Sequence, residues 1–494
     1  MPDTNKVSEY EERIKKLENL KKEGINPYPA KTKRTHLIKA ALLDFAKLEK
    51  GKEKISLAGR LRSLRSHGNL TFANLEDESG KIQIAVSKKE IGDKNYKIFE
   101  KFIDMGDFIE VEGECFLTHK GEKSVLAKNW KLLAKALRPL PDKWSGLKDE
   151  EERFRKRYLD IIFNPEVKEM IGKRAKFWQA TREFLIKKGF LEIETPVLEI
   201  TTGGADARPF ITHHNALNLD AYLRISAGEL WQKKLMVAGL EKVFEIGRIF
   251  RNEGMDSEHL QDYSQMEFYW AYADYEEGMK LVEEMYKYIA QEVFGTLKFK
   301  IRGFEVDLSK TWERYDYQKT IKKYTGVDIL KAKEKEIKDK LNELKVEYDK
   351  KGFNITRAID NLWKYCRRQI SGPGFLVGAP ITVSPLAKRD DKDPETAQRF
   401  QVILAGSELG NGYSELNDPT DQEKRFREQQ KLREAGDEEA QMFDKDFVEA
   451  LEYGMPPTCG FGFSERLFAF LMDKPARETQ IFPLMRPKWR EDSK

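Results

Sequence analysis

The stretch IFRNEGMDSEHLQDYSQMEFYWAY, residues 249–272, decides how the second half of this chain folds. Two apolar segments flank a polar loop, which predicts a β-hairpin. Because side chains alternate along a strand, two sets should each share one face: Arg251 with Glu253, and Tyr263 with Gln265, Glu267 and Tyr269. Arginine can grip a phosphate or carboxylate through two parallel hydrogen bonds. The alternative is an exposed hairpin crossed by surface salt bridges.

Two further stretches carry the same kinds of side chain. GSELGNGYSELND, residues 406–418, places glycines inside an expected strand, where glycine commonly marks a bulge or a close approach by a ligand. Glu408 and Glu415, next to Asn411, suit a hard cation such as Mg²⁺ or an ammonium group. In CGFGFSERLFAFLM, residues 459–472, Arg466 falls at a strand-to-helix junction, where it can face a nucleotide. The alternatives are a glycine-broken turn with solvated acids and an arginine extending from an amphipathic helix.

The rest of this half predicts an α+β domain on a mainly antiparallel sheet flanked by helices. We expect a long helix over 165–188, then a strand, and further strands at 243–251, 264–271, 298–307, 375–383, 398–406 and 411–416. Neither GxGxxG nor GxxxxGK[ST] occurs, so phosphate would have to be bound by side chains. A Lys/Glu-rich segment within 327–372 predicts a helical insertion with a solvated amphipathic helix.

In the first half of the chain, a helical pattern gives way to short stretches in which apolar and polar residues alternate. Residues 8–24 predict a surface helix within a helical extension over 1–52. Over 53–141, about five short alternating strands and one helix predict a small OB-type barrel, and KALRPLPDKWSG predicts the linker to a second domain over 142–494. Residues 1–142 carry 29 Lys and Arg against 22 Asp and Glu. That balance fits either a polyanion-binding module or solvated helix faces.

Several classes are disfavoured. The three cysteines, Cys115, Cys366 and Cys459, form no CxxC or Cys/His spacing, which argues against a zinc site and a disulfide framework and fits a reducing cytoplasm. The N-terminal stretch has no apolar core of a signal peptide. No run of about 18 apolar residues occurs, so we expect no membrane association.

Taken together, these motifs resemble the class II aminoacyl-tRNA synthetases, most closely the lysyl-tRNA synthetases, over nearly the whole chain. KKGFLEIETPVLE, FRNEG through DYSQMEF, and GFGFSERL resemble the three motifs of the class. TTGGADARPFITHHNALNLDAYLRIS, TVSPLAKRDD, GNGYSELND and LEYGMPPT resemble the lysine branch. The resemblance implies an OB-fold anticodon-binding domain, a class II catalytic domain and a homodimer that uses ATP and Mg²⁺ to join L-lysine to tRNA(Lys).

It also implies roles for individual residues. Arg251 and Arg466 would be catalytic, Tyr263 would stack on adenine, and Glu408 would bind Mg²⁺. The implied ATP-binding residues are Arg251, Glu253, His259, Tyr263, Glu408 and Arg466. The implied lysine-binding residues are Gly204, Glu229, Arg251, Glu267, Tyr269, Asn411, Tyr413 and Glu415. In the barrel, the expected anticodon-binding face is Arg60, Arg62, Arg65, His67 and Phe72, unless Phe72 is barrel core.

The chain departs from the family pattern at several points. Glu258 stands where an arginine is usual, and Gln401 stands where a second metal-binding glutamate is usual. The third motif is about one residue shorter than the family's usual form, and the stretch ISAGEL is about one residue longer than its usual form. Because of these departures, a catalytically silent tRNA-binding paralogue stays open. An aspartyl- or asparaginyl-type synthetase is a further alternative, although GNGYSELND and the Glu267 and Glu415 pair speak against it. A relative that lysylates a protein is disfavoured, because it lacks the barrel.

Overall fold

The computed structural model describes residues 8–141, 149–205, 207–254, 258–348, 353–436 and 440–487. The chain divides into two compact units, residues 1–150 and 151–494, and each is described by itself. The last residues of the expected linker, from Asp142 onward, lie outside the described residues. The expected α+β fold, an OB barrel followed by a domain on a mainly antiparallel sheet, is confirmed.

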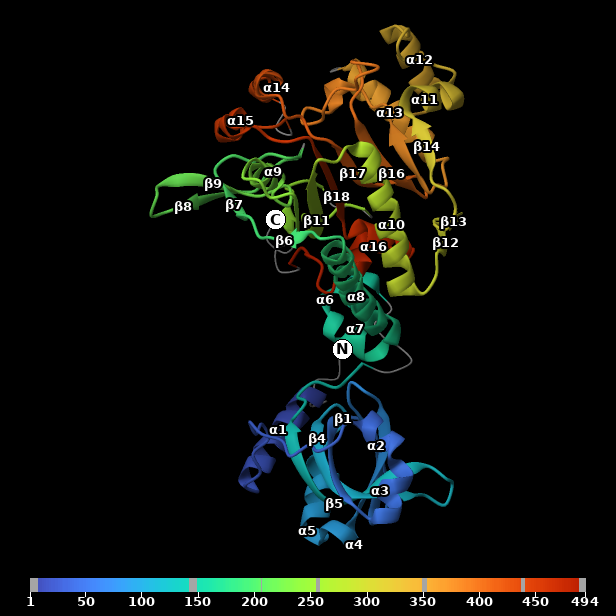
Figure 1. The fold of residues 1–494 in the computed structure, drawn as a ribbon. Helices are drawn as coiled ribbons and strands as arrows, with labels where there is room; N and C mark the ends of the chain where they lie inside the picture. Colours follow the sequence, from blue (N-terminus) through green and yellow to red (C-terminus); the bar gives the residue numbers. More distant parts are fainter. Residues whose placement is uncertain are drawn as a thin grey trace, which may run out of the picture. The chain divides into compact units, whose positions relative to one another are not determined.

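The first unit contains a closed five-stranded barrel with the strand order β1-β2-β3-β5-β4 (Figure 1). Its strands are β1 (Lys54–His67), β2 (Leu70–Glu76), β3 (Lys81–Ser87), β4 (Phe108–Leu117) and β5 (Lys123–Ala134). Helices α4 (Lys88–Ile91) and α5 (Asp93–Phe102) connect β3 to β4. Every second residue of β2 is buried, as the alternating sequence predicts for a strand with one face on a core.

Three helices precede the barrel and share its core. They are α1 (Glu9–Lys22), α2 (Ile38–Leu43) and α3 (Phe45–Gly51). Ser8 and Glu11 form a reciprocal capping box at the start of α1. Leu20, Ile38 and Phe45 are buried in the same cluster as the inward side chains of the strands. The helical extension therefore packs on the barrel and does not form a separate unit.

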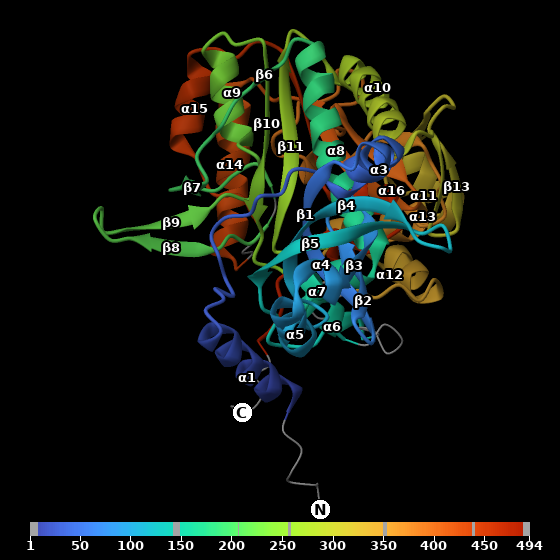
Figure 2. The ribbon, with the colours of Figure 1, turned by 90° about the horizontal axis from the view of Figure 1, so that it is seen from below.

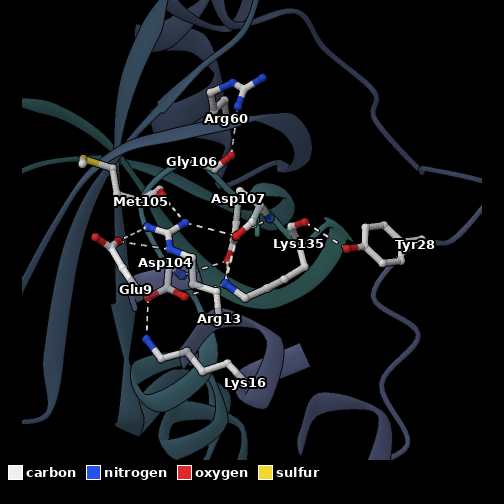
Figure 3. Close-up of polar contacts among 11 residues, drawn as sticks. Glu9, Arg13, Lys16, Tyr28, Arg60, Asp104, Met105, Gly106, Asp107 and Lys135 are labelled. Carbon is white, nitrogen blue, oxygen red and sulfur yellow. Dashed lines mark hydrogen bonds and ion pairs between the residues drawn. The ribbon is translucent and has the colours of Figure 1, made fainter. Parts of the chain in front are cut away.

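Buried charges join α1 to the barrel, as the close-up in Figure 3 shows. Arg13 Nη1 donates hydrogen bonds to two backbone carbonyl oxygens of the barrel, each at 3.1 Å. Lys16 Nζ lies 2.5 Å from Asp104 Oδ1. The fully buried Lys135 Nζ lies 2.6 Å from Asp104 Oδ2 and 2.9 Å from Asp107 Oδ2. Arg13 also pairs with Glu9 at 3.0 Å, so Arg13 and Lys135 each have a partner of opposite sign, which is the condition for burying a charge at tolerable cost.

The second unit is built on an eight-stranded sheet with the order β14-β15-β16-β17-β18-β11-β10-β6. Its strands are β6 (Leu191–Glu192), β10 (Lys242–Phe250), β11 (Asp262–Ala271), β14 (Glu313–Asp316), β15 (Gly374–Val377), β16 (Arg399–Leu404), β17 (Ser407–Ser414) and β18 (Thr458–Ser464). Only the pairs β10–β6 and β14–β15, among the described residues, are parallel within this sheet. The hairpin expected over 249–272 is the β10–β11 pair. Its antiparallel register runs from Lys242 opposite Trp270 to Phe250 opposite Asp262.

Three smaller features differ from the expected strands. The strand expected after the long helix is two short strands, β6 and β7 (Leu198–Glu199). β7 joins β8 (Ile211–His214) and β9 (Leu219–Leu223), and the β8–β9 hairpin projects outward in both views (Figures 1 and 2). The strand expected over 298–307 is a hairpin of β12 (Lys298–Ile301) and β13 (Phe304–Asp307), because Arg302 and Gly303 turn the chain with positive φ. β15 ends at Val377, before Pro380 interrupts the pattern.

Helices cover the sheet (Figures 1 and 2). α8 (Pro165–Lys187) and α10 (Tyr275–Phe294) pack on one face in the largest apolar cluster. α9 (Glu229–Val237), α14 (Pro419–Glu434) and α15 (Lys445–Glu452) form a second cluster with β10 and β11. Outside residues 317–367, the other helical elements described in this unit are α6 (Glu150–Arg155), α7 (Arg157–Phe163), α16 (Arg466–Leu471) and two 3₁₀ turns, Ile381–Val383 and Ala476–Thr479.

The segment expected to be a helical insertion has its own core. Residues 327–372 contain α12 (Glu334–Glu343) and α13 (Ile355–Arg367), and α11 (Tyr317–Thr325), which precedes the expected bounds, packs with them. Their shared core includes Ile337, Leu341 and Trp363. α12 is the expected amphipathic helix, with its charged residues facing solvent. Across the described residues, no helix combines the length and apolarity that crossing a membrane requires.

Candidate active site

A cavity of about 420 Å³ lies in the second unit, over the central strands of the sheet. Twelve of the predicted ATP- and lysine-binding residues line it: Gly204, Glu229, Arg251, His259, Tyr263, Glu267, Tyr269, Glu408, Asn411, Tyr413, Glu415 and Arg466. Glu253 is the exception. Because β10 ends at Phe250, the expected alternation does not reach Glu253, which is exposed and outside the lining.

The strand register explains how so many polar side chains meet. Gly460 of β18 is paired with Tyr269 on one side and with Tyr413 on the other. Gly462 is paired with Glu267 and with Asn411 in the same way. Directly paired residues point to the same face of a sheet. The two glycines therefore form a floor between two walls of polar side chains.

Both glycines are required by space. A Cβ on Gly460 would lie 2.1 Å from Glu415 Oε1 and 2.6 Å from a ring carbon of Tyr269. On Gly462 it would lie 2.8 Å from Glu267 Cγ. Gly204 has the same function in a loop, since its Cβ would lie 2.6 Å from Glu229 Cβ. The glycine spacing of the third sequence motif thus makes room for the acidic side chains.

The deep end of the cavity is acidic. Glu267 Oε1 accepts a hydrogen bond from the backbone N–H of Ala227 at 2.8 Å and a short one from Gln265 Nε2. Tyr269 Oη donates to Glu267 Oε2 at 3.3 Å. Burial, reinforced by the nearby charge of Glu229, raises the pKa of Glu267 to about 7. The site therefore holds a carboxyl group that loses its proton and becomes negatively charged when a cation approaches.

Lys233 is a site residue that the sequence motifs did not reveal. It extends from α9, is 1% exposed, and places Nζ 2.7 Å from Glu229 Oε1 and 2.5 Å from Glu415 Oε2. Burial by itself would lower the pKa of Lys233, but the two carboxylates outweigh burial and raise it. Burial raises the pKa of Glu415 despite the attraction of Lys233. The spacing of Glu229 and Lys233, one helical turn apart, was a signal that could have found the pair.

Glu415 also has a free side. Its Oε1 is buried and accepts no hydrogen bond from any described residue. A buried acceptor without a donor costs about 1–3 kcal/mol, so such an atom points to a ligand that supplies the donor. Tyr413 Oη donates to Glu229, which orders the opposite wall.

The other end of the cavity is basic and aromatic. Arg251 follows β10, bonds through its backbone N–H to Gln261 at 2.7 Å, and places Cζ 5.8 Å from the centre of the Tyr263 ring. Arg399, which the sequence motifs also did not reveal, lines the cavity and donates from Nε to Asn411 Oδ1 at 2.8 Å. Arg466 opens α16 and lines the same end. Planar guanidinium groups beside an aromatic ring suit a nucleotide's phosphates and base.

Glu408 is positioned by the helical insertion. Trp363 of α13 donates from Nε1 to Glu408 Oε1 at 2.5 Å, and Gln401 Nε2 donates to Oε2 at 3.2 Å. Among the described residues, no group of three or more His, Cys, Asp or Glu side chains could hold a metal ion. Mg²⁺ usually binds one or two carboxylates together with substrate phosphates and water. One carboxylate beside an amide on the cavity wall fits a magnesium ion that arrives with a polyphosphate.

The barrel presents a separate candidate site. Arg65 of β1 pairs directly with Phe72 of β2 on the outer face, while Ala73 and Leu75 point into the core. Phe72 is half-buried and does not belong to the core cluster, which removes the alternative that it is barrel core. His67 is exposed at the end of β1 on the same face.

The two remaining arginines of this predicted face have protein partners. Arg60 Nη1 donates to Gly106 O at 3.1 Å, and its Cζ lies 4.1 Å from the centre of the Phe108 ring. Arg62 forms an ion pair with Glu76 at 3.2 Å. Arg65, His67 and Phe72 are therefore the members of the set most accessible to a nucleic acid.

Comparisons with known proteins identify the family of each domain. A family described as "tRNA synthetases class II (D, K and N)" matches residues 149–486, and one described as "OB-fold nucleic acid binding domain" matches residues 55–133. A lysine–tRNA ligase of Thermoanaerobacter pseudethanolicus is 48% identical over 96% of this chain and 95% of its own. The lysine–tRNA ligase of Thermosipho africanus is 44% identical over 97% of this chain and 96% of its own. That of Thermotoga maritima is 43% identical over 98% of this chain and 97% of its own.

Proposed function

Because the chain belongs to the class II tRNA synthetases, we propose that it ligates L-lysine to tRNA(Lys) with ATP, through a lysyl-adenylate. The observation that carries the choice of lysine is the charge of the cavity's deep end. Three buried carboxylates, Glu229, Glu267 and Glu415, lie there with one buried ammonium, that of Lys233, which pairs with Glu229 and Glu415. When ionised, this group has a net charge of about −2, which the α- and ε-ammonium groups of lysine neutralise.

Glu415 Oε1 and the Glu267 carboxylate accept the ε-ammonium, and Glu229 beside Gly204 accepts the α-ammonium. Arg251 pairs with the lysine carboxylate and the α-phosphate. Aspartate or asparagine would bring a carboxylate or amide oxygen against the same acids, so the pocket disfavours the substrates of the other branches. A neutral analogue of lysine would leave buried charges unpaired, a strong basis for rejection.

The reaction needs no protein nucleophile. The lysine carboxylate attacks the α-phosphorus, the bond to the bridging oxygen breaks, and pyrophosphate leaves. Arg251 and Arg466 orient the reactants and neutralise charge as it develops. Tyr263 stacks on the adenine, and His259 contacts the phosphate tail. Magnesium bound to ATP would be held by Glu408 and would neutralise charge on the leaving pyrophosphate.

The barrel, over residues 53–141, binds the anticodon through Phe72, Arg65 and His67, and the catalytic domain spans 142–494. We place the enzyme in the cytoplasm as a homodimer. Support for the dimer comes from exposed apolar side chains around the first motif, since Val197, Leu198 and Ile200 are 41%, 51% and 71% exposed. Apolar surface of this kind, grouped in one segment, usually marks an interface.

The test is ATP–pyrophosphate exchange by the purified protein with Mg²⁺, each amino acid in turn and no tRNA. Exchange with lysine alone is expected. Exchange with aspartate or asparagine would overturn the choice of substrate, and no exchange from folded protein that binds tRNA would favour a silent paralogue.

A further inference from the structure

An ion-pair cluster at the mouth of the cavity joins Arg466 to two residues, Glu258 and Arg302, that have no role in the function proposed above. The carboxylate of Glu258 bridges two arginines, with Oε1 on Arg302 Nη1 and Oε2 on Arg466 Nη2, both at short distances. Glu258 and Arg466 line the cavity, whereas Arg302 lies outside its lining. Their side chains are 19%, 20% and 35% exposed, respectively. The cluster thus lies where the basic end of the cavity opens to solvent.

The two arginines are held at a fixed spacing by the protein. Both guanidinium groups lie over the buried ring of Phe470, with Cζ of Arg302 and Arg466 at 4.0 and 5.5 Å from its centre. Arg302 also occupies the β12–β13 turn, where its backbone N–H donates to Asp473 Oδ1 at 2.8 Å. Arg466 Nη1 donates to the backbone oxygen of Glu408 at 3.3 Å. The pair is therefore pre-arranged around a gap that an anion with two oxygens bridges.

A carboxylate and a phosphate group are interchangeable in such a gap. Each presents oxygens that accept charge-assisted hydrogen bonds from two guanidinium groups. In the ligand-free structure the anion is Glu258, whose pKa the two arginines lower against the effect of burial. A triphosphate that enters the basic end of the cavity would compete with it for Arg466.

Resting on the proposed function, in which Arg466 binds ATP, we infer that Arg302 adds a second guanidinium group to the subsite for the terminal phosphates, and that Glu258 is an internal anion that ATP displaces. Glu258 lowers the affinity for ATP, because two ion pairs must be exchanged before the phosphates bind. AMP lacks the β- and γ-phosphates and does not reach this subsite. Glu258 thus changes the affinity for triphosphates alone.

The test compares Glu258→Gln with the wild type by calorimetric binding of α,β-methylene-ATP with Mg²⁺, and of AMP. Glu258→Gln should bind the ATP analogue about tenfold more tightly, a change of about 1.4 kcal/mol, with AMP affinity unchanged. In exchange assays the KM for ATP should fall while the KM for lysine stays constant. The matched control is Glu276→Gln, which removes a carboxylate that pairs with Arg314 at the surface of the same unit.

A second substitution tests the arginine. In the Glu258→Gln background, where no carboxylate competes, Arg302→Gln should weaken binding of the analogue about tenfold and leave AMP binding unchanged. The inference would be overturned if Glu258→Gln bound the ATP analogue no more tightly than the wild type does. It would also be overturned if the substitution changed the affinity for AMP as much as the affinity for the ATP analogue. Failure of the proposed function is distinct: the wild type itself would then bind no ATP analogue and support no exchange with lysine.

Discussion

Lys233 Nζ lies 2.5 Å from Glu415 Oε2, and both side chains are 1% exposed. The same ammonium group lies 2.7 Å from Glu229 Oε1. A lysine of the protein thus stands among the acids that we assign to the substrate lysine. It neutralises part of their charge, so the cavity can hold three carboxylates before substrate arrives.

Substituting Lys233 should therefore destabilise the ligand-free protein more than the lysine-bound protein. For Lys233→Met we expect a loss of about 3–5 kcal/mol in the free energy of unfolding, because two buried carboxylates lose their counter-ion. Saturating lysine should recover part of that loss, since its ammonium groups supply positive charge. Denaturant unfolding with and without lysine measures both effects. Lys234→Met, the half-buried neighbour, is the control, and equal losses in the two variants would contradict the prediction.

The raised pKa of Glu267, about 7, predicts that lysine binding depends on pH. Below this pKa the free enzyme is protonated at Glu267, so a cationic ligand must displace a proton before it pairs with the carboxylate. Lysine affinity should consequently increase as the pH rises from about 6 to about 8, and binding near pH 7 should release protons. Calorimetry in two buffers of different ionisation enthalpy measures the release. AMP binding, distant from Glu267, should show no such step, and pH-independent lysine affinity would refute the assignment.

Gly460→Ala should abolish the use of lysine at ordinary concentrations. The added methyl carbon would lie 2.1 Å from Glu415 Oε1, so the carboxylate must move from its position. We expect the KM for lysine to rise on the order of a hundredfold, comparable to about 2.7 kcal/mol, with a smaller change in the KM for ATP. Gly172→Ala in α8, where a Cβ meets nothing within 4 Å, is the matched control. A variant with wild-type lysine kinetics would exclude the proposed floor of the pocket.

Phe72→Ala should weaken tRNA binding without affecting adenylate formation. Loss of one base-stacking aromatic typically costs about 1–3 kcal/mol, so affinity for tRNA should fall by a factor between about 5 and about 150. Filter binding measures the affinity, and ATP–pyrophosphate exchange without tRNA should remain unchanged. Leu117→Ala, which truncates a 49% exposed residue of the same barrel, serves as the control. If exchange fell together with tRNA binding, Phe72 would be a stability residue instead.

Much of the fold followed from local patterns. Alternation of apolar and polar residues predicted the barrel strands and the β10–β11 hairpin, because both depend on side-chain period and turn residues near in sequence. The same alternation placed Glu267 and Tyr269 on one face. It failed for Glu253, since where a strand ends depends on its pairing partner, and β10 ends at Phe250.

The sequence by itself determined the two-part architecture, the acidic and basic residue sets, and the glycines between them, since all are visible in short motifs. Only the tertiary structure decided the partners. Lys233, Trp363 and Arg302 come from α9, the helical insertion and the β12–β13 turn, yet they contact Glu415, Glu408 and Glu258. Such contacts join segments far apart in the chain. Their energies depend on distance and burial, which become defined only when the sheet brings those segments together.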